Sequence, residues 1–577
     1  MEIFYFLRKT FVPDKPNRLG GAKKRSVRKM ERLYKRYVNE TLDENGMLKS
    51  ISFNIPDDFN FGFDVVDEMA RRNPKKKAMV WLGQDKEERI FTFEDMSRYS
   101  NMTANYFRAN GIKKGDHVML VLKRRYEFWF CIVALHKIGA VVIPATHQLM
   151  KKDYVYRFKT ANVKAIVCVP NDGVCEEVEK ALSDYDGIKF KSVIQVNRNG
   201  WDNFETGIAK YPDTFEIGED RPMADEDMLM YFTSGTSSYP KAATHSHKYA
   251  IGHIVTAVWW HNVDPDGLHL TIADTGWGKA VWGKLYGQWL AEACVFTYDF
   301  DRFHADDILP LFAKYHITTF CAPPTMYRFF IKEDLAKYDL SSLQYCTIAG
   351  EALNPEVFRQ FYNATGIKLM EGFGQTETTL TVANLRGMEP KPGSMGKPNP
   401  QYNVEIVDEN GKPVVPGVVG EIVIHTDKEQ IGLFKNYYGD KSLTDEVWSD
   451  GVYHTGDTAW KDNDGYFWYV GRTDDLIKSS GYRIGPFEIE SVIMEHPKVL
   501  EVAVTGVPDP IRGMVVKATI LLVKGEKGSD ELAKEIQNFV KERTAPYKYP
   551  RIVEFVDELP KTISGKIQRA KIRGDKY

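Results

Sequence analysis

Residues 117–144, HVMLVLKRRYEFWFCIVALHKIGAVVIP, carry the pattern that decides the fold. The apolar runs 117–122 and 140–144 have the length of buried strands, and residues 126–138 between them suit a helix. A helix between two such runs is typical of a βαβ unit, in which the strands are parallel and the helix covers the sheet. The stretch therefore predicts an α/β protein with a mostly parallel, helix-covered sheet.

The same alternation continues in both directions. We expect a helix at 101–110, further strands at 165–170 and 192–196, and a second block of strands at 318–322 and 345–349. Repetition of the unit over this length predicts a large α/β region.

The pattern changes twice after this region. From Gly393 onward, short apolar runs alternate with glycine-rich turns and predict a β-rich subdomain, with strands at 404–407, 420–425 and 466–470. Near residue 471 a compact α+β unit begins. Its expected elements are helices at 487–495 and 529–543 and strands at 500–507 and 516–523.

Composition limits the class of protein. Of the 577 residues, 43% are hydrophobic and 27% are charged, which is ordinary for a globular enzyme. The net charge of −2 provides no overall field for nucleic acid, and the six cysteines include no C-x-x-C pair, which suits a reducing compartment. Because no apolar run approaches the ~18–20 residues of a membrane span, we expect no stable membrane insertion.

The N-terminus is strongly basic, and two interpretations of it stay open. Residues 1–36 contain twelve Lys or Arg side chains and three acidic ones. Such a start is typical of a transit peptide. Hydrophobic residues also recur at helical spacing, which favours an amphipathic helix packed on the body; they are Met30, Leu33, Tyr34, Tyr37 and Val38.

Residues 231–244, YFTSGTSSYPKAAT, place five hydroxyl side chains around one glycine. The loop follows an apolar run at 228–232 and precedes the helix-compatible residues 245–258, an order that presents backbone N–H groups and a positive helix end to an anion. A solvated Ser/Thr loop is the competing interpretation. The P-loop pattern G-x-x-x-x-G-K-[ST] does not fit, so we predict another kind of polyphosphate loop.

Further motifs accompany this loop in order along the chain. They are Gly350-Glu351, EGFGQTET at 371–378, YHTGD ending at Asp457, GRTDDLIKSSGYRIGPFEIE at 471–490 and PKTISGKIQR at 560–569. Together they resemble the AMP-forming acyl-CoA synthetases of the adenylate-forming superfamily, over nearly the whole chain. Within that superfamily the chain is similar to the medium-chain or branched-chain acyl-CoA synthetases.

The resemblance implies a domain organisation. A basic extension would span 1–55 and an AMP-binding adenylation domain 56–473, with two helix-covered, mostly parallel sheets and the β-rich subdomain. Residues 474–577 would form a small mobile α+β C-terminal domain.

The resemblance also implies which residues bind ATP and AMP. The 231–244 loop would hold the β- and γ-phosphates, although Ser238 stands where the family usually has glycine. Phe373 would stack on adenine, and Asp457 and Arg472 would reach the ribose. The expected set is Thr233, Ser234, Gly235, Thr236, Ser237, Lys241, Gly350, Glu351, Ala352, Glu371, Gly372, Phe373, Gly374, Gln375, Thr376, Asp457, Arg472 and Arg483.

Three residues match the family's catalytic positions. Lys566 would bridge the carboxylate and phosphate oxygens at the transition state of acyl-adenylate formation, where like charges repel. Thr376 would contact the α-phosphate, and Glu377 would hold the Mg²⁺ that accompanies ATP.

The second half-reaction, attack of coenzyme A on the acyl-adenylate, is assigned in the same way. The small domain would rotate about the hinge Asp474, bringing Ser480 and Gly481 to coenzyme A and Arg483 to a phosphate. A second, structural Mg²⁺ site would use Met494, His496 and Val499.

The acyl pocket is expected at Trp277, Lys279 and Gly374. Acetyl-CoA synthetases resemble this chain but have tryptophan at the position of Gly374, so the glycine predicts a longer, branched or aromatic acid. Four histidines crowd one segment, but their spacing does not place them on one helix face, which favours a structural role over a ligand role; they are His245, His247, His253 and His261.

The leading hypothesis is an ATP- and coenzyme A-dependent ligase of medium-chain, branched or aromatic acids, active in fatty acid metabolism. Alternatives are an adenylating enzyme that loads a carrier domain, for which no carrier motif follows in the sequence, a luciferase-like oxygenase, and a nucleotide-binding regulator without catalysis. We expect small-molecule partners, a possible homo-oligomer, and a cytoplasmic location, or the mitochondrial matrix in a eukaryote.

Overall fold

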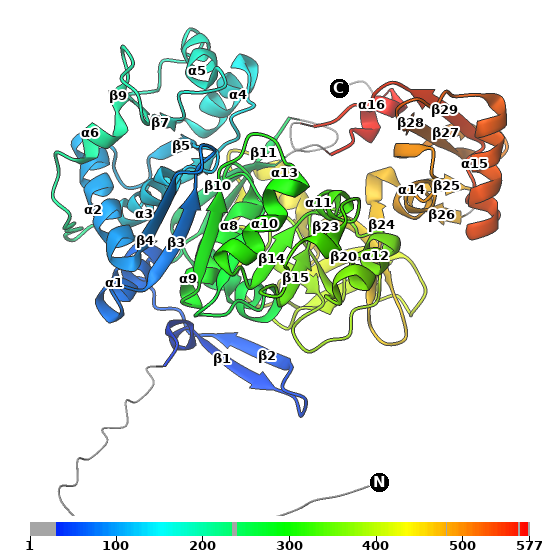
Figure 1. The fold of residues 1–577 in the computed structure, drawn as a ribbon, viewed down its shortest axis with the longest axis horizontal. Coiled ribbons are helices and arrows are strands. Elements are labelled where there is room, and N and C mark those ends of the chain that lie inside the picture. Colours follow the sequence, from blue (N-terminus) through cyan, green and yellow to red (C-terminus); the bar gives the residue numbers. More distant parts are fainter. Residues whose placement is uncertain (1–30, 234–238, 481, 563–565, 575–577) are drawn as a thin grey trace, which may run out of the picture.

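The computed structural model describes residues 31–233, 239–480, 482–562 and 566–574. In Figure 1 the β1–β2 hairpin lies at the lower edge of the body, and the small C-terminal unit lies on the upper side. Within the described ranges, no helix has both the length and the apolar character to cross a membrane.

The opening stretch of the sequence forms the centre of the first sheet. This eight-stranded sheet has the order β21-β11-β10-β6-β5-β7-β8-β9 and is parallel from β10 to β9. Its strands are β5 His117–Val121, β6 Val141–Pro144, β7 Ala165–Cys168, β8 Phe190–Val193, β9 Asp202–Asn203, β10 Asp227–Thr233, β11 Lys241–Ser246 and β21 Asn436–Tyr437. Its helices are α2 Phe93–Ala109, α3 Glu127–Ile138, α4 Lys151–Ala161, α5 Val174–Leu182 and α6 Phe204–Ile208.

The second sheet has nine strands in the order β18-β17-β16-β15-β14-β12-β13-β3-β4 and is parallel from β16 to β3. Its strands are β3 Lys77–Leu82, β4 Glu88–Thr92, β12 Leu268–Thr271, β13 Cys294–Tyr298, β14 Thr319–Ala322, β15 Tyr345–Ile348, β16 Leu369–Gly374, β17 Leu380–Ala383 and β18 Lys397–Pro398. Nearby helices are α7 Lys248–Ile254, η3 Val255–Trp260, α8 Gly278–Lys284, α9 Tyr286–Leu290, α10 Ala305–Tyr315, α11 Pro324–Phe330, η4 Leu335–Lys337 and α12 Pro355–Thr365.

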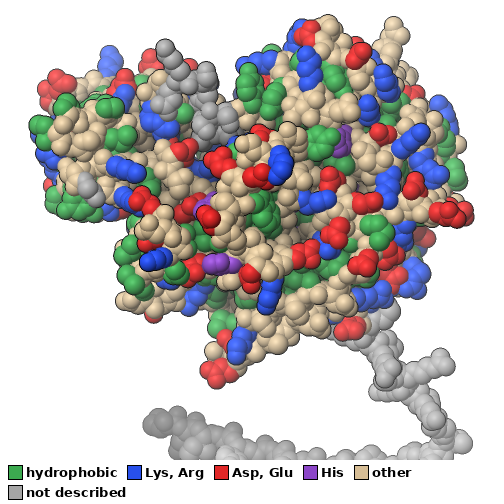
Figure 2. Space-filling view, turned by 180° about the vertical axis from the view of Figure 1, so that it is seen from behind, with side chains coloured by type: hydrophobic (Ala, Val, Ile, Leu, Met, Phe, Trp, Pro, Cys, Tyr) green, Lys and Arg blue, Asp and Glu red, His purple; other side chains and the backbone are tan. Residues whose placement is uncertain are grey.

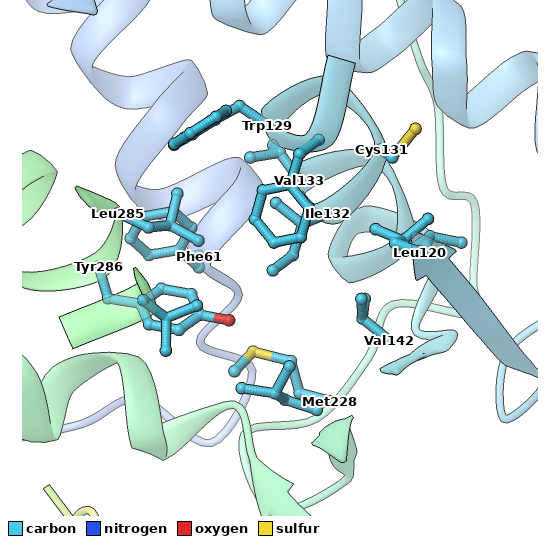
Figure 3. Packing of buried hydrophobic residues seen from close by; sticks show 14 of the residues in the cluster. Phe61, Leu120, Trp129, Cys131, Ile132, Val133, Val142, Met228, Leu285 and Tyr286 are labelled. Carbon is cyan, nitrogen blue, oxygen red and sulfur yellow. The ribbon is translucent and has the colours of Figure 1, made fainter. Parts of the chain in front are cut away.

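Helix α3 explains how the two sheets share a core. All of its residues are buried, including Glu127 and Lys137. Figure 3 shows Trp129, Ile132 and Val133 between side chains of the first sheet (Leu120, Val142 and Met228) and residues of the second block (Leu285 and Tyr286). Because both faces of the helix are covered, it is apolar all round instead of amphipathic.

Two smaller units follow, as expected from the sequence. The β-rich unit contains β19 Val404–Val407, β20 Gly420–His425, β22 Trp448–Ser449, β23 Val452–Lys461, β24 Phe467–Arg472 and α13 Lys441–Val447. The C-terminal unit contains β25 Ile477–Ser479, β26 Tyr482–Ile484, β27 Val499–Asp509, β28 Gly513–Leu522, β29 Ile552–Val556, α14 Pro486–Ile493, α15 Asp530–Arg543 and α16 Arg569–Arg573, after the short helix η5 Thr473–Asp475. The C-terminal unit has its own apolar core.

The N-terminal segment differs from the expected amphipathic helix. From Glu31 onward, where the described residues begin, the chain forms the 3-10 turn η1 Leu33–Arg36 and then the hairpin of β1 Val38–Leu42 and β2 Leu48–Phe53. Met30 lies outside the described residues. The side chains of Leu33, Tyr34, Tyr37 and Val38 nevertheless lie in the main core, so the expected packing on the body holds. The π-helix η2 Gly62–Asp67 and helix α1 Glu68–Arg72 follow.

A second difference concerns the expected helix at 245–258. Residues 241–246 instead form β11, an antiparallel partner of β10 in which Thr233 lies opposite Lys241. The helix α7 begins only at Lys248 and continues as the π-helix η3. The hydroxyl-rich loop therefore closes a β-hairpin, and the predicted positive helix end does not follow it directly.

Candidate active site

The two ends of the hydroxyl-rich hairpin are held in place by aromatic rings. Tyr156 stacks on Tyr239 with centroids 5.0 Å apart, and the Tyr156 hydroxyl donates to the Pro240 carbonyl over 2.9 Å. On the other strand, the Lys241 ammonium lies 5.4 Å from the ring centroid of Tyr437. Ser234, Gly235, Thr236, Ser237 and Ser238 lie outside the described residues, so their expected phosphate contacts stay predictions.

Tyr437 connects this hairpin to the expected magnesium ligand. Its hydroxyl donates to Oε1 of Glu377 over 2.8 Å, and the Glu377 carbonyl accepts from the N–H of Phe434 over 2.7 Å. Burial, together with the Glu377 carboxylate, raises the pKa of Tyr437. Lys241 and Glu377 are 136 positions apart in the sequence, yet Lys241 contacts the ring of Tyr437 and Glu377 contacts its hydroxyl.

His245 positions the residue before Glu377. Its Nε2 lies 2.8 Å from the carbonyl oxygen of Thr376. Burial lowers the pKa of His245 to about 4, so the ring is neutral at pH 7 and donates to this carbonyl. From spacing, this histidine was expected to have only a structural role. It lies in β11, two residues after Ala243, which pairs with Tyr437, and spacing does not show that position.

Asp457 is the centre of a buried polar cluster. Its side chain accepts hydrogen bonds from the Tyr469 hydroxyl over 3.0 Å and from Nε2 of Gln375, and Nη1 of Arg472 lies 3.4 Å from Oδ2. Burial raises the pKa of Asp457, and the charges of Arg472 and Lys566 and the two hydrogen bonds oppose that rise. This cluster brings together three expected nucleotide contacts and one residue, Tyr469, that the motifs did not single out.

Gln375 links the EGFG segment to this cluster. Its Nε2 also donates to the Thr455 carbonyl over 2.7 Å, and its Oε1 accepts from the Tyr453 hydroxyl over 2.8 Å. With all its polar atoms engaged, the side chain orients Asp457 rather than pointing freely to solvent. Phe373, two residues earlier, lies 6.2 Å from the Tyr469 ring and is half-buried.

Glu371 is buried and serves the fold of the same segment. It is 3% exposed, and its Oε1 accepts from the N–H of Leu353 over 3.1 Å. Burial raises its pKa to about 8, so the carboxyl group is mostly protonated at neutral pH. It connects β16 to the 350–352 segment, where Gly350 adopts a positive φ of 106° that favours glycine.

The 350–352 segment is open on one side and touches the expected acyl pocket on the other. Gly350 and Glu351 are exposed and Ala352 is half-buried. The half-buried Lys279 donates from Nζ to the Ala349 carbonyl. Desolvation lowers the pKa of Lys279, the Lys566 charge adds to that effect, and Glu351 opposes it. The Lys279 ammonium therefore lies beside the 350–352 segment.

The wall at Gly374 is closed by tryptophans. A Cβ atom at Gly374 would lie 2.5 Å from Cη2 of Trp282 and 2.4 Å from the Thr379 carbonyl oxygen, and one at Gly372 would lie 2.7 Å from the Trp260 ring. Trp277 and Lys279 were expected in this pocket, and Trp282 was not. In the structure, Trp282 occupies the space beside the glycine, and Trp277 is the half-buried residue before α8.

Lys566 belongs to the C-terminal unit but lies beside the body. Its N–H donates to Oγ1 of Thr562 over 3.1 Å, and its carbonyl accepts from the Thr562 N–H over 2.7 Å, which closes a short loop. Its charge lowers the pKa values of both Asp457 and Lys279. Asp457 belongs to strand β23 and Lys279 to helix α8, so the charge of Lys566 acts on two separate parts of the body.

The junction between the body and the C-terminal unit contains the expected hinge. Nε of Arg472, in the body, lies 3.7 Å from Oδ1 of Asp474. The next residue, Asp475, is 4% exposed and pairs instead with Arg569 and Arg573 of α16. Asp474 therefore pairs with a residue of the body and Asp475 with residues of the C-terminal unit. Later residues of that unit contact the body again, as in the hydrogen bond from Nδ2 of Asn354 to the Ser491 carbonyl.

The expected coenzyme A contacts lie away from the Asp457 cluster. Ser480 adopts a positive φ of 50°, and its N–H donates to the Arg512 carbonyl over 2.8 Å. The guanidinium group of Arg483 pairs with Glu409, which belongs to the turn between β19 and β20. Gly481 lies outside the described residues.

The second magnesium site was expected at Met494, His496 and Val499 of the C-terminal unit. Within the described ranges, no group of three or more His, Cys, Asp or Glu side chains could hold a metal ion. Nε2 of His496 lies 3.1 Å from Glu535, and its carbonyl accepts from the Val499 N–H over 3.0 Å. Met494 donates its N–H to the Glu490 carbonyl over 2.9 Å. The second magnesium site therefore stays a prediction.

Comparison with known proteins agrees with this geometry. The model of the "AMP-binding enzyme" family matches residues 66–438, and that of the "AMP-binding enzyme C-terminal domain" matches residues 488–566. The chain is 41% identical over 538 residues to "Acyl-coenzyme A synthetase ACSM3, mitochondrial" of Homo sapiens, covering 91% of each chain. It is 40% identical over 551 residues to "Acyl-coenzyme A synthetase ACSM4, mitochondrial" of Mus musculus, covering 93% of this chain and 94% of the other.

Solved structures show the same fold. An anthranilate CoA ligase, AuaEII, in complex with anthranoyl-AMP superimposes with a TM-score of 0.81 at 28% identity, covering 90% of this chain and 98% of the other. A benzoate CoA ligase from Burkholderia xenovorans LB400 superimposes with a TM-score of 0.77 at 25% identity, covering 89% of this chain and 100% of the other. Both have the large α/β body and small C-terminal domain that the sequence predicted.

Proposed function

This chain belongs to the AMP-binding enzyme family, and on that premise we propose that it is an ATP-dependent acyl-CoA ligase of medium-chain, branched or aromatic acids. A carboxylate would attack the α-phosphate of ATP to give acyl-AMP and pyrophosphate. The thiol of coenzyme A would then displace AMP and form the thioester. The observation that carries the proposal is 40–41% identity to acyl-coenzyme A synthetases over more than nine-tenths of their length.

The residues around Tyr437 suit the triphosphate. Lys241 would neutralise phosphate charge from one strand of the hairpin, and Glu377 offers a carboxylate on the other side of Tyr437. A carboxylate beside phosphates is the hard oxygen ligand that Mg²⁺ prefers, so the donor set fits this ion. When bound, Mg²⁺ would neutralise charge on the phosphates. Thr376, held by His245, would contact the α-phosphate.

The Asp457 cluster suits the ribose. A buried carboxylate that is already oriented by Tyr469, Gln375 and Arg472 can accept hydrogen bonds from two sugar hydroxyls without reorganising. Phe373 and the 350–352 segment would cover the two faces of adenine.

Lys566 suits the transition state of the first step. Attack of one anion on another is slowed by charge repulsion, and a cation that touches both reduces the barrier. Lys566 approaches from a short loop of another domain, at a point where its charge acts on both Asp457 and Lys279. Rotation about Asp474 would remove it and bring Ser480, Gly481 and Arg483 to coenzyme A for the second step.

The acid itself is proposed from the walls of the pocket. Gly372 and Gly374 leave room for Trp260 and Trp282, which would present flat apolar surfaces to an alkyl chain or an aromatic ring. The aromatic acids named in the two structural matches support a pocket of this kind. We propose acids of butyrate size and above, including 2-methyl and benzoic acids.

Further proposals concern organisation and location. We propose domain boundaries of 1–55, 56–473 and 474–577, supported by the separate apolar core of the C-terminal unit. The mitochondrial relatives support a mitochondrial matrix location over a cytoplasmic one. A homo-oligomer is proposed without a defined interface.

The test is a screen of acids for AMP release that depends on coenzyme A. C2 to C12, branched and aromatic acids are each incubated with ATP, Mg²⁺ and coenzyme A. We expect AMP release to require coenzyme A and to be greater with hexanoate or benzoate than with acetate. ATP–pyrophosphate exchange without thioester formation would instead support an enzyme that loads a carrier protein.

A further inference from the structure

Strand β1 of the N-terminal hairpin contains a buried carboxylate, Glu40. Its side chain is 2% exposed, and a charge so deeply buried needs polar partners. Oε1 accepts a hydrogen bond from indole Nε1 of Trp259 over 2.6 Å, and Oε2 pairs with the Lys35 ammonium. One acid therefore ties the hairpin to the π-helix η3.

The hairpin holds Trp259 together with a second segment of the body. The Arg386 guanidinium lies 4.2 Å from the Trp259 ring centroid, and the Arg386 N–H donates to the Trp259 carbonyl over 2.6 Å. Next to Arg386, Gly387 leaves room for Met47 of the hairpin, since a Cβ there would lie 2.8 Å from Met47 Cγ. The hairpin thus packs on both η3 and the segment after β17.

The residue after Trp259, Trp260, is fully buried and packs against strand β16, which ends at Gly374 of the expected acyl pocket. Nε1 of Trp260 donates to the Met370 carbonyl over 3.0 Å, and its ring leaves no room for a side chain at Gly372. The segment after β17 reaches the same strand, because the Asn384 N–H donates to the Glu371 carbonyl over 2.9 Å. The two segments that the hairpin contacts, η3 and the residues after β17, therefore both contact residues 370–372 of β16, and residue 372 is two positions before Gly374.

We propose that Glu40 is a positioning residue for the acyl pocket: it fixes Trp259, and thereby Trp260, against β16. This inference rests on the proposed function. Glu371 and Gly372 also belong to the expected nucleotide set, but the expected phosphate and ribose residues Lys241, Glu377 and Asp457 are held by contacts in which neither the hairpin nor η3 takes part. Loss of Glu40 should therefore weaken binding of the acid more than binding of ATP.

The test compares three variants of the full chain by ATP–pyrophosphate exchange. Glu40→Ala leaves the buried indole N–H without an acceptor, and we expect the KM for hexanoate to rise about tenfold. Glu40→Gln keeps the acceptor and should restore KM to within about threefold of wild type. Glu44→Ala, which removes an exposed carboxylate in the turn between β1 and β2, is the matched control. The KM for ATP and the Tm are measured for each.

The outcomes distinguish this inference from the proposed function. A rise in KM for the acid in Glu40→Ala, with a smaller change or none in the KM for ATP and rescue by Glu40→Gln, supports it. A lower Tm with unchanged KM values, or equal increases for ATP and acid, would show that Glu40 serves stability alone and overturn it. Absence of exchange with every acid in the wild type would refute the proposed function and the inference with it.

Discussion

Asp457 and Lys566 lie close enough for one charge to alter the pKa of the other, but they are held in different ways. Asp457 is 5% exposed and is fixed by Gln375, the residue after β16, and by Tyr469 of β24. Lys566 is exposed, and its contacts within the described residues are main-chain ones to Thr562. A group fixed by several side chains suits binding of nucleotide throughout the cycle, and an exposed residue suits a role in one step after which it leaves.

The largest expected effect concerns Lys566, the exposed residue of this pair. Lys566→Ala should lower ATP–pyrophosphate exchange by about 10²–10³-fold, the scale of losing one group that stabilises developing charge. Lys571→Ala, in α16 of the same unit, is the control and should retain near wild-type exchange. Equal losses in the two variants would mean that general charge, not the position of Lys566, matters.

Substitution of Asp457, the residue held by several side chains, should alter the KM for ATP. Asp457→Asn keeps the shape but removes the charge, so the KM for ATP should rise about ten- to a hundredfold while the KM for the acid stays the same. Because burial raises the pKa of Asp457, the wild type should also lose activity on acidification earlier than an ordinary carboxyl would predict. The decrease in kcat/KM for ATP that protonation of Asp457 causes at low pH should be absent in Asp457→Asn.

A third prediction tests the walls of the pocket. Since no side chain fits at Gly374, substitution there would distort the Thr379 carbonyl, and Trp282 is the better probe. Trp282→Ala should raise the ratio of kcat/KM for octanoate to that for butyrate by about tenfold, from burial of roughly two further methylenes. An unchanged ratio in a protein of normal Tm would place the acid elsewhere.

A smaller effect is expected at the junction between the units. The exposed pair of Arg483 with Glu409 must break if the small domain rotates. Glu409→Gln should therefore speed thioester formation from pre-made acyl-AMP by about two- to fivefold, the scale of an exposed ion pair. A variant with slower thioester formation would show that Glu409 assists coenzyme A rather than holding Arg483 away from it.

The smallest effect concerns stability. The pKa of Glu371 rises from an ordinary 4.5 to about 8 on folding, so the folded protein binds the extra proton and its stability falls as pH rises between these values. Glu371→Gln cannot ionise. Between pH 5.5 and 8 the Tm of the wild type should fall by at least about 2 °C more than that of the variant. Parallel curves would mean that Glu371 is ionised in the fold.

Local patterns predicted the fold well where neighbouring residues determine it. The β5–α3–β6 unit begins and ends within one residue of the expected bounds. The expected helix at 101–110 begins instead at Phe93, because Thr92 and Asp95 form a capping box. The helix expected at 245–258 begins instead at Lys248, because His245 and Ser246 complete a strand whose pairing with β10 is non-local.

The family motifs named candidate site residues, and the structure brings Gln375, Asp457 and Arg472 together, while their roles stay predictions. The family assignment itself is confirmed by the comparisons. The residues that orient the named ones were not predictable: Tyr437, Tyr469, His245 and Trp282 lie outside the motifs and act through tertiary side-chain contacts that sequence spacing does not show. The region around Asp457 depends most on such contacts, whereas Lys566 depends on a motif alone.

The most direct test of the central claim uses pre-made hexanoyl-AMP and coenzyme A with Lys566→Ala. Lys566 is proposed to act only while the carboxylate attacks ATP and to leave before the thiol attacks. The rate of hexanoyl-CoA formation should therefore stay within about threefold of wild type, although exchange falls by about 10²–10³-fold. An equal loss in both half-reactions would contradict the division between a fixed binding cluster and a cation that leaves.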